Sequence, residues 1–156
     1  MNVVLVEPEI PPNTGNVARL CAATASTLHL IEPFGFTLDD KQLKRAGLDY
    51  WQHIKWHRWP DWPTFQQQLP ASARLWLVES NGERHYAEVS FLPEDYVVFG
   101  RETAGLPRAI LDEYQDHWLR IPMFHPGVRS LNLSNCVALV VYEALRQQGF
   151  AGAICS

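Results

Sequence analysis

The sequence contains few cysteines and none of their usual functional spacings. Only three occur among 156 residues, at Cys21, Cys136 and Cys155. Because their number is odd and no pair follows CxxC spacing, the sequence predicts neither a disulfide framework nor a zinc knuckle. Such sparing use of cysteine fits the reducing cytoplasm, where we expect the protein to reside.

Long hydrophobic runs and positive charge are also scarce. The longest apolar stretch, residues 136–142, stops at Glu143, far short of the roughly 20 residues that cross a bilayer. Residues 1–6 have no basic flank and are too few for a signal peptide. The formal net charge of −4 is a weak argument against a general polyanion binder, and we expect any nucleic-acid site to be a local patch. We expect a soluble protein without a membrane partner, forming one domain over residues 1–156.

Several motifs that would identify a cofactor or a reaction are missing. No GxGxxG follows the first predicted strand and no GxxxxGK[ST] occurs, so dinucleotide-binding and P-loop functions lack their phosphate cradle. Neither HExxH spacing nor an acidic cluster is present, and we predict no metal site. The absence of a GxSxG elbow argues against a serine hydrolase.

The sequence does contain an alternation of strand-like and helical segments. Strands are predicted at residues 2–6, 27–31, 74–79, 96–99 and 117–123. Helices are predicted at residues 16–25, 39–46, 61–69, 107–114 and 131–148. This alternation is typical of an α/β fold in which a mostly parallel sheet is flanked by helices. The last helix is apolar almost all round, which favours burial against a partner subunit on one side.

Three loops rich in glycine and small polar residues follow predicted strands. They are PPNTGN at residues 11–16, FGRETAGLP at 99–107 and IPMFHPGVRSLNLSN at 121–135. Parallel strands end at one edge of a sheet, where open α/β folds bind ligands. We expect positive φ angles or close backbone approach at the glycines, and hydrogen bonds or helix caps from the small polar residues: Gly15, Gly100, Gly105, Gly127, Ser130, Asn132 and Ser134.

Each loop taken alone could be an ordinary strand-to-helix turn. Together they predict a pocket for a small polar ligand beside Arg19, Glu102, Arg129 and Asn132. Composition and spacing identify the ligand no further.

The same loops carry a family resemblance. NTGNVAR (13–19), FGRETAGLP (99–107) and IPMFHPGVRSLNLSNCVALVVYEALRQ (121–147) resemble, in order and spacing, the three motifs of the SPOUT (SpoU-type) RNA ribose 2'-O-methyltransferases. EPEIPPNTGN and EPFGFTLDDKQLKRAGLDYW, with no appended RNA-binding domain, make the chain most similar to the minimal members that methylate the wobble nucleotide of tRNA, cytidine or modified uridine.

The resemblance implies a deep C-terminal trefoil knot that holds S-adenosylmethionine as methyl donor, and a homodimer formed through the last helix. It also implies the residues that bind this cofactor, which correspond here to Val78, Gly100, Ile121 and Ser130, with Leu131 lining the pocket. The implied partner is the tRNA anticodon stem-loop.

The implied catalytic set is Arg19, Asn16, Glu102 and Asn132. A guanidinium is a poor base, so we expect Arg19 to orient the 2'-hydroxyl and stabilise the developing alkoxide, while substrate phosphate or solvent takes the proton. The two asparagines are expected to fix loops rather than touch substrate. A purely structural alternative pairs Arg19 with Glu102 or another acid.

For RNA contact we predict a local positive surface made by Arg129 beside the cofactor loops and by Lys41, Lys44 and Arg45 on a short helix. Four tryptophans, Trp51, Trp56, Trp59 and Trp62, could stack on unpaired anticodon bases or could pack against the sheet. Two other functions stay open: a SPOUT enzyme acting on another tRNA position or on ribosomal RNA, and a non-catalytic RNA- or nucleotide-binding module.

Overall fold

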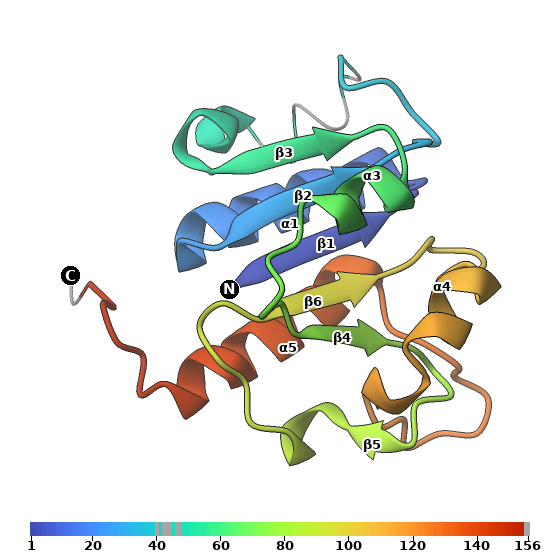
Figure 1. The fold of residues 1–156 in the computed structure, drawn as a ribbon. Helices are drawn as coiled ribbons and strands as arrows, with labels where there is room; N and C mark the ends of the chain where they lie inside the picture. The colour runs from blue at the N-terminus through green and yellow to red at the C-terminus, as the bar shows by residue number, and fades with distance from the viewer. Residues whose placement is uncertain (40, 42–44, 46–47, 155–156) are drawn as a thin grey trace.

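The computed structural model describes residues 1–39, 41, 45 and 48–154, and a seven-stranded sheet forms its centre (Figure 1). The order across the sheet is β3-β2-β1-β6-β4-β7-β5, and every pair of neighbours is parallel. The strands are β1 Asn2–Val6, β2 Thr27–Ile31, β3 Trp56–Trp59, β4 Leu75–Val78, β5 Arg84–His85, β6 Tyr96–Phe99 and β7 Trp118–Arg120. The predicted α/β fold with a parallel sheet is therefore confirmed.

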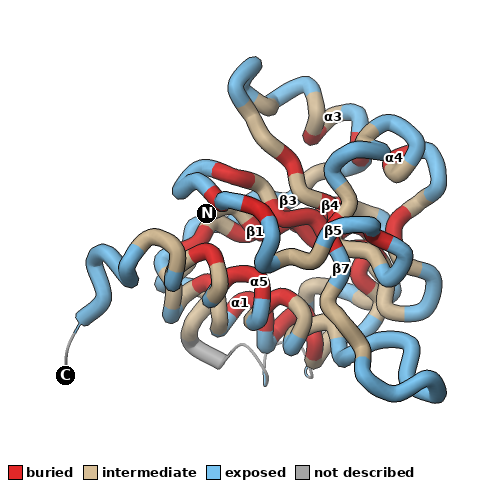
Figure 2. The backbone as a smooth tube through the Cα atoms, turned by 90° about the horizontal axis from the view of Figure 1, so that it is seen from below, coloured by how far each residue is buried: buried red, intermediate tan, exposed pale blue. Residues whose placement is uncertain are grey.

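Helices cover both faces of this sheet (Figure 2). Helices α1 (Pro11–Thr24) and α5 (Leu133–Gln147) lie on one face, and α3 (Trp62–Gln67) and α4 (Arg108–Glu113) lie on the other. Short 3-10 turns complete the structure at η1 (Leu48–His53), η2 (Tyr86–Glu88) and η3 (Gln115–His117). Each layer encloses its own apolar core, which is why β1 and β6 read as continuous hydrophobic runs.

Helix α1 begins earlier than the sequence predicted. It starts at Pro11 rather than at Asn16, so the stretch predicted as a loop is helical, and Gly15 is buried within it. Two prolines occupy the first helical positions, where a missing N–H and a fixed φ cost nothing. The turn-like composition of PPNTGN therefore marks the start of a helix.

Strands β3 and β5 were not predicted. Strand β3 has the sequence WHRW with its first three residues exposed, and it lies at an edge of the sheet, so it carries no buried apolar run. Strand β5 is only two residues long. The predicted helix at 39–46 lies largely outside the described residues. Within that range Lys41 and Arg45 are among the residues described, and both are exposed.

Helix α5 has two distinct apolar faces. Val137, Val140, Val141 and Ala144 are buried against the sheet and α1. Leu139 and Tyr142, in contrast, are 40% and 48% exposed. Among the described residues, no helix is long and apolar enough to span a bilayer.

Candidate active site

Loops from well-separated parts of the chain meet at the carboxyl edge of the sheet. Strands β1, β6 and β7 all run in the same direction, so residues 7–10, 100–107 and 121–132 leave the sheet on the same side (Figure 1). The predicted gathering at one edge is confirmed for the loops after β6 and β7, and the first segment at this edge is residues 7–10 with the start of α1 rather than a loop at 11–16. The side chains that join these loops make up the candidate site.

A chain of hydrogen bonds links the three motifs through Glu102. Its carboxylate accepts from the backbone N–H of Glu9 at 2.8 Å and of Ile10 at 3.1 Å, and from Nδ2 of Asn13 at 3.2 Å. Oδ1 of Asn13 then accepts from Nδ2 of Asn132 at 2.8 Å. Since Asn13 is only 5% exposed, this link is shielded from water, and it ties the start of α1 to both other loops.

Asn132 also forms the predicted helix cap. Its Oδ1 accepts from the backbone N–H of Ser134 at 2.9 Å and from the Ser134 hydroxyl at 2.7 Å. The side chain therefore satisfies a free donor at the start of α5 while its amide holds Asn13. This is the loop-fixing role that the sequence suggested for it.

Three further acidic residues hold residues 101–106. The Glu9 carboxylate accepts from the backbone N–H of Thr103 at 3.0 Å and from its hydroxyl, and Arg101 Nη1 lies 3.5 Å from Glu7 Oε2. The Thr103 hydroxyl, and after it the Thr103 backbone, keeps the pKa of the Glu9 carboxyl below its usual value. Glu79, just after β4, accepts from the backbone N–H of Leu106 at 2.7 Å. The loop is therefore fixed along most of its length.

Two glycines allow the tight path of this loop. A Cβ on Gly100 would lie 2.2 Å from the backbone C of Gly105 and the backbone N of Leu106. Gly105 has a φ of 68°, in the left-handed region that favours glycine. Both expectations for these residues are confirmed, whereas Gly127 does not have a positive φ.

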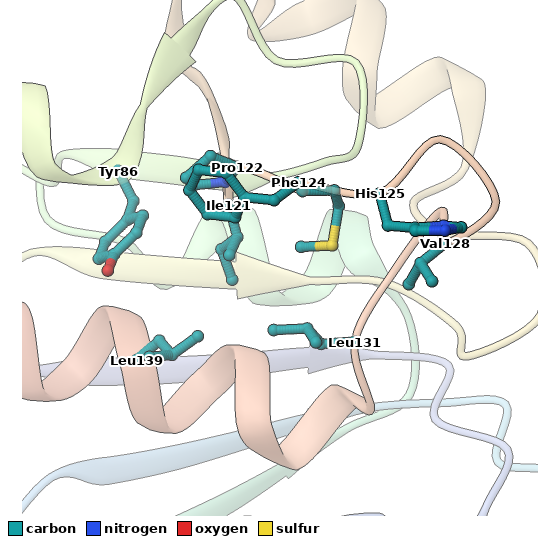
Figure 3. A pocket seen from close by; sticks show the side chains of 9 residues that line it. Tyr86, Ile121, Pro122, Phe124, His125, Val128, Leu131 and Leu139 are labelled. Carbon is teal, nitrogen blue, oxygen red and sulfur yellow. The ribbon is translucent and has the colours of Figure 1, made fainter.

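A pocket of about 460 Å³ opens between the loop after β7 and helix α5 (Figure 3). Its walls are predominantly apolar, and the highly exposed Phe124 stands at the loop side. The residues that line it are Tyr86, Ile121, Pro122, Met123, Phe124, His125, Val128, Leu131 and Leu139. Two of the predicted cofactor residues, Ile121 and Leu131, are among them.

The other predicted cofactor residues are not among those that line the pocket, and only Ser130 is adjacent in the chain to a lining residue, Leu131. Val78 ends β4, Gly100 directly follows β6 and is buried, and Ser130 is exposed beside Leu131. Predicted Arg129 is also exposed in this loop. Among the predicted cofactor residues, the pocket itself therefore contains Ile121 and Leu131, while Val78 and Gly100 lie at the ends of β4 and β6.

Arg19 is exposed on α1, about one turn beyond exposed Asn16. Its guanidinium carbon lies 5.2 Å from the centre of the Tyr50 ring. Arg19 and Glu102 form no ion pair, because the Glu102 carboxylate faces the start of α1 instead. The structural alternative that joined these two residues is therefore wrong.

The predicted basic surface is only partly described. Lys41, Arg45 and Arg129 are exposed, and Lys44 lies outside the described residues. Two other arginines near the loops are paired with acids, Arg101 with Glu7 and Arg108 with Asp112 at 2.8 Å. Of the predicted basic surface, the structure therefore describes three exposed cations, Lys41, Arg45 and Arg129.

The tryptophans are used mainly for packing. Trp62 is buried, and Trp59 donates from Nε1 to Nδ1 of His29 at 3.1 Å. Trp51 packs against the core beside α1 and meets Trp56 edge-on at 5.3 Å. Only Trp56, at 36% exposure, offers a substantial open surface among the four.

Sequence reasoning missed three residues that build the site: Glu9, Asn13 and Glu79. Each is held by a partner that is far away in sequence, as in the Asn13 to Asn132 contact. Asn13 and Asn16 belong to the same motif. Their roles differ because Asn13 is buried and Asn16 is exposed. Helical spacing would not have supplied that signal, because residues three positions apart lie on the same side of a helix.

Comparison with known proteins identifies a family model and similar proteins that match nearly the whole chain. Residues 1–142 match the model of the SpoU rRNA Methylase family. A protein of Saccharophagus degradans named tRNA (cytidine(34)-2'-O)-methyltransferase is 56% identical over 155 residues, covering 97% of each chain.

Solved structures agree with this match. A structure described as giving insight into the 2-OH methylation of C/U34 on tRNA superposes with a TM-score of 0.91 at 45% identity, covering 96% of both chains. The methyltransferase AviRb from Streptomyces viridochromogenes, in complex with its cofactor AdoMet, has a TM-score of 0.83 at 23% identity. That match covers 97% of this chain and 58% of AviRb, and it supports the fold alone.

Proposed function

The chain belongs to the SpoU rRNA methylase family, and from this premise we propose that it methylates the ribose 2'-hydroxyl of the wobble nucleotide, position 34, of tRNA. The observation that carries the proposal is the hydrogen-bonded junction of Glu102, Asn13 and Asn132, which joins all three motifs beside the pocket. Near-full-length relatives named for this reaction support the choice of substrate.

The methyl donor we propose is S-adenosylmethionine, and the pocket fits it. Its volume of about 460 Å³ lies within the usual range for small-molecule sites, and its apolar walls suit an adenine ring. Residues 121–132 form no helix or strand, so backbone groups are available for the polar edges of the cofactor. Ile121 and Leu131 would hold it from two sides. Val78, Gly100 and Ser130, which the family resemblance implies, are proposed to complete the site. When bound, the cofactor supplies a methyl group on a positively charged sulfur.

The protein's task in this reaction is to position the ribose oxygen. Arg19 is proposed to donate hydrogen bonds to the 2'-oxygen and to stabilise its developing negative charge. Because a guanidinium stays protonated, a substrate phosphate or water accepts the proton. Asn13 and Arg19 lie on the same helix, so the junction with Glu102 and Asn132 fixes the helix that carries Arg19.

RNA is proposed to approach along α1 and the loop after β7. Arg19 of α1 and Arg129 of this loop are exposed, as are Lys41 and Arg45. Together with Lys44, known from the sequence, they are proposed to neutralise phosphates of the anticodon stem-loop. A local cluster of cations can bind RNA although the net charge of the whole chain is negative.

The proposal includes the architecture implied by the family resemblance. The segment from the loop after β7 to α5 is proposed to form the trefoil knot, within a single domain that acts in the cytoplasm. The exposed face of α5, with Leu139 and Tyr142, supports a homodimer through this helix.

The function is tested by incubating the purified protein with labelled S-adenosylmethionine and unmodified tRNA. We expect label in tRNA with the wild type and at least a hundredfold loss in Arg19→Ala, because that variant lacks its transition-state donor. Calorimetry with the cofactor is the control, since Arg19 is not needed for the pocket and binding should persist. Undiminished transfer by Arg19→Ala would remove this residue from the mechanism.

A further inference from the structure

The guanidinium of Arg19 lies over an aromatic ring that no motif assigns. Its Cζ is 5.2 Å from the centre of the Tyr50 ring, inside the distance of about 6 Å at which a cation is attracted by a ring face. The two residues come from different elements, α1 and η1, which pack against each other. The contact is therefore tertiary.

The turn that carries Tyr50 is anchored in the core. The neighbouring Trp51 and nearby Ile54 pack against the apolar core on the α1 and α5 face. Trp51 also contacts Trp56 of β3 at 5.3 Å between ring centres. With these anchors next to it, Tyr50 presents its ring from a fixed backbone.

A ring is a suitable support for an arginine that must bind substrate. It attracts the cation through its face and accepts none of the guanidinium N–H groups in conventional hydrogen bonds. An acidic partner would occupy those donors and offset the charge. Arg19 forms no ion pair with a described side chain, so the Tyr50 ring can orient it while its donors stay available.

We propose that Tyr50 is a positioning residue for methyl transfer, whose ring holds the Arg19 guanidinium in the orientation that receives the ribose 2'-oxygen. This inference rests on the proposed function of the site, and it adds a residue that the three motifs do not contain. It predicts that the ring, and not the hydroxyl of Tyr50, is the required feature.

Kinetics of Tyr50→Leu and Tyr50→Phe test this role. In Tyr50→Leu we expect kcat to fall about two- to fivefold, the value of an exposed cation–ring contact, with an unchanged KM for S-adenosylmethionine. Tyr50→Phe keeps the ring face and should therefore have the kcat of the wild type. Equal losses of kcat in both variants, or no loss in either, would overturn the proposal. An effect confined to the KM for tRNA would also overturn it, because the ring would then contact RNA directly.

A second measurement needs no activity. The Nε–H resonance of Arg19 in the protein without RNA should be displaced by the ring in the wild type and in Tyr50→Phe, and should return toward the free value in Tyr50→Leu. An identical resonance in all three proteins would refute the contact in solution. If the resonance behaves as expected but the wild type transfers no methyl group to tRNA, the proposed function fails, and the catalytic role of Tyr50 with it, although the contact stands.

Discussion

The Glu102 carboxylate is occupied by three donors from the beginning of α1, two backbone N–H groups and the Asn13 amide. It places a negative charge at the N-terminal end of a 14-residue helix, where the helix dipole favours it. A carboxylate used in this way organises the site rather than abstracting a proton. We therefore assign Glu102 a positioning role in the proposed catalytic set.

Replacement of Glu102 by glutamine tests that role. Glutamine keeps the shape but loses the charge, and it turns an amide toward groups that are themselves donors. Hydrogen bonds to charged groups contribute about 1.5–3 kcal/mol, so we expect the free energy of unfolding in urea to fall by about 2 kcal/mol. Glu83→Gln, at an exposed position, is the matched control and should change it by less than about 0.5 kcal/mol. Equal stability of the two variants would show that the Glu102 contacts contribute nothing.

Helices and strands were predictable where their residues follow a simple pattern. The strands β1, β2 and β6 are buried on both faces and mostly apolar, and their predicted bounds agree with the structure. Strand β3 was not predicted because an edge strand needs no apolar run. The start of α1 was not predicted because PPNTGN has the composition of a turn. The loops could be placed at one sheet edge, but the contact of Asn13 with Asn132, 119 positions apart, depends on the folded chain.

The loop after β6 gives a prediction about packing. In Gly100→Ala the new Cβ would meet backbone atoms at 2.2 Å, and backbone cannot turn away as a side chain can. We expect a loss of about 1–3 kcal/mol in stability, seen as a melting temperature several degrees lower, together with weaker cofactor binding.

Gly127→Ala is the matched control for this loop. Its Cβ would meet only the His125 side chain, at 3.2 Å, and the backbone there has no positive φ. We expect its melting temperature to stay near that of the wild type. If Gly100→Ala melts no lower than Gly127→Ala, the tight packing between Gly100 and Gly105 is refuted.

Stability of the whole chain should depend on pH through one buried histidine. His29 is 6% exposed, and its burial, with a further contribution from nearby His57 and Lys55, lowers its pKa to about 4. Trp59 donates to its Nδ1, so the neutral ring carries its proton on Nε2, which faces Asn2 Oδ1 at 3.3 Å. Protonation would bring a second N–H against that of Trp59.

The direction of this pH dependence follows from proton binding. Between an unfolded pKa near 6.5 and the folded value of about 4, the unfolded chain binds more protons, so acid favours unfolding. As the pH falls from 6.5 to 4, His29 should therefore lower the free energy of unfolding by about 1.4 kcal/mol for each pH unit. Urea unfolding of the wild type and His29→Gln from pH 7.5 to 4 measures it. A slope as steep in the variant as in the wild type would exclude His29 as the source.

The molecule as a whole combines a hydrogen-bonded sheet edge, a pocket beside α5 and an exposed arginine on α1. None of these parts transfers a methyl group alone, and the hydrogen bonds among the three motif loops hold them together. We propose that this assembly acts on one ribose oxygen of tRNA.

The most direct test uses two synthetic anticodon stem-loops that differ by a single oxygen atom. One carries ribocytidine at the wobble position and the other 2'-deoxycytidine, and both are incubated with the protein and labelled S-adenosylmethionine. We predict label in the first RNA only, recovered as 2'-O-methylcytidine from the wobble nucleotide. Equal labelling of both RNAs, or a methyl group recovered from any other nucleotide, would contradict the account.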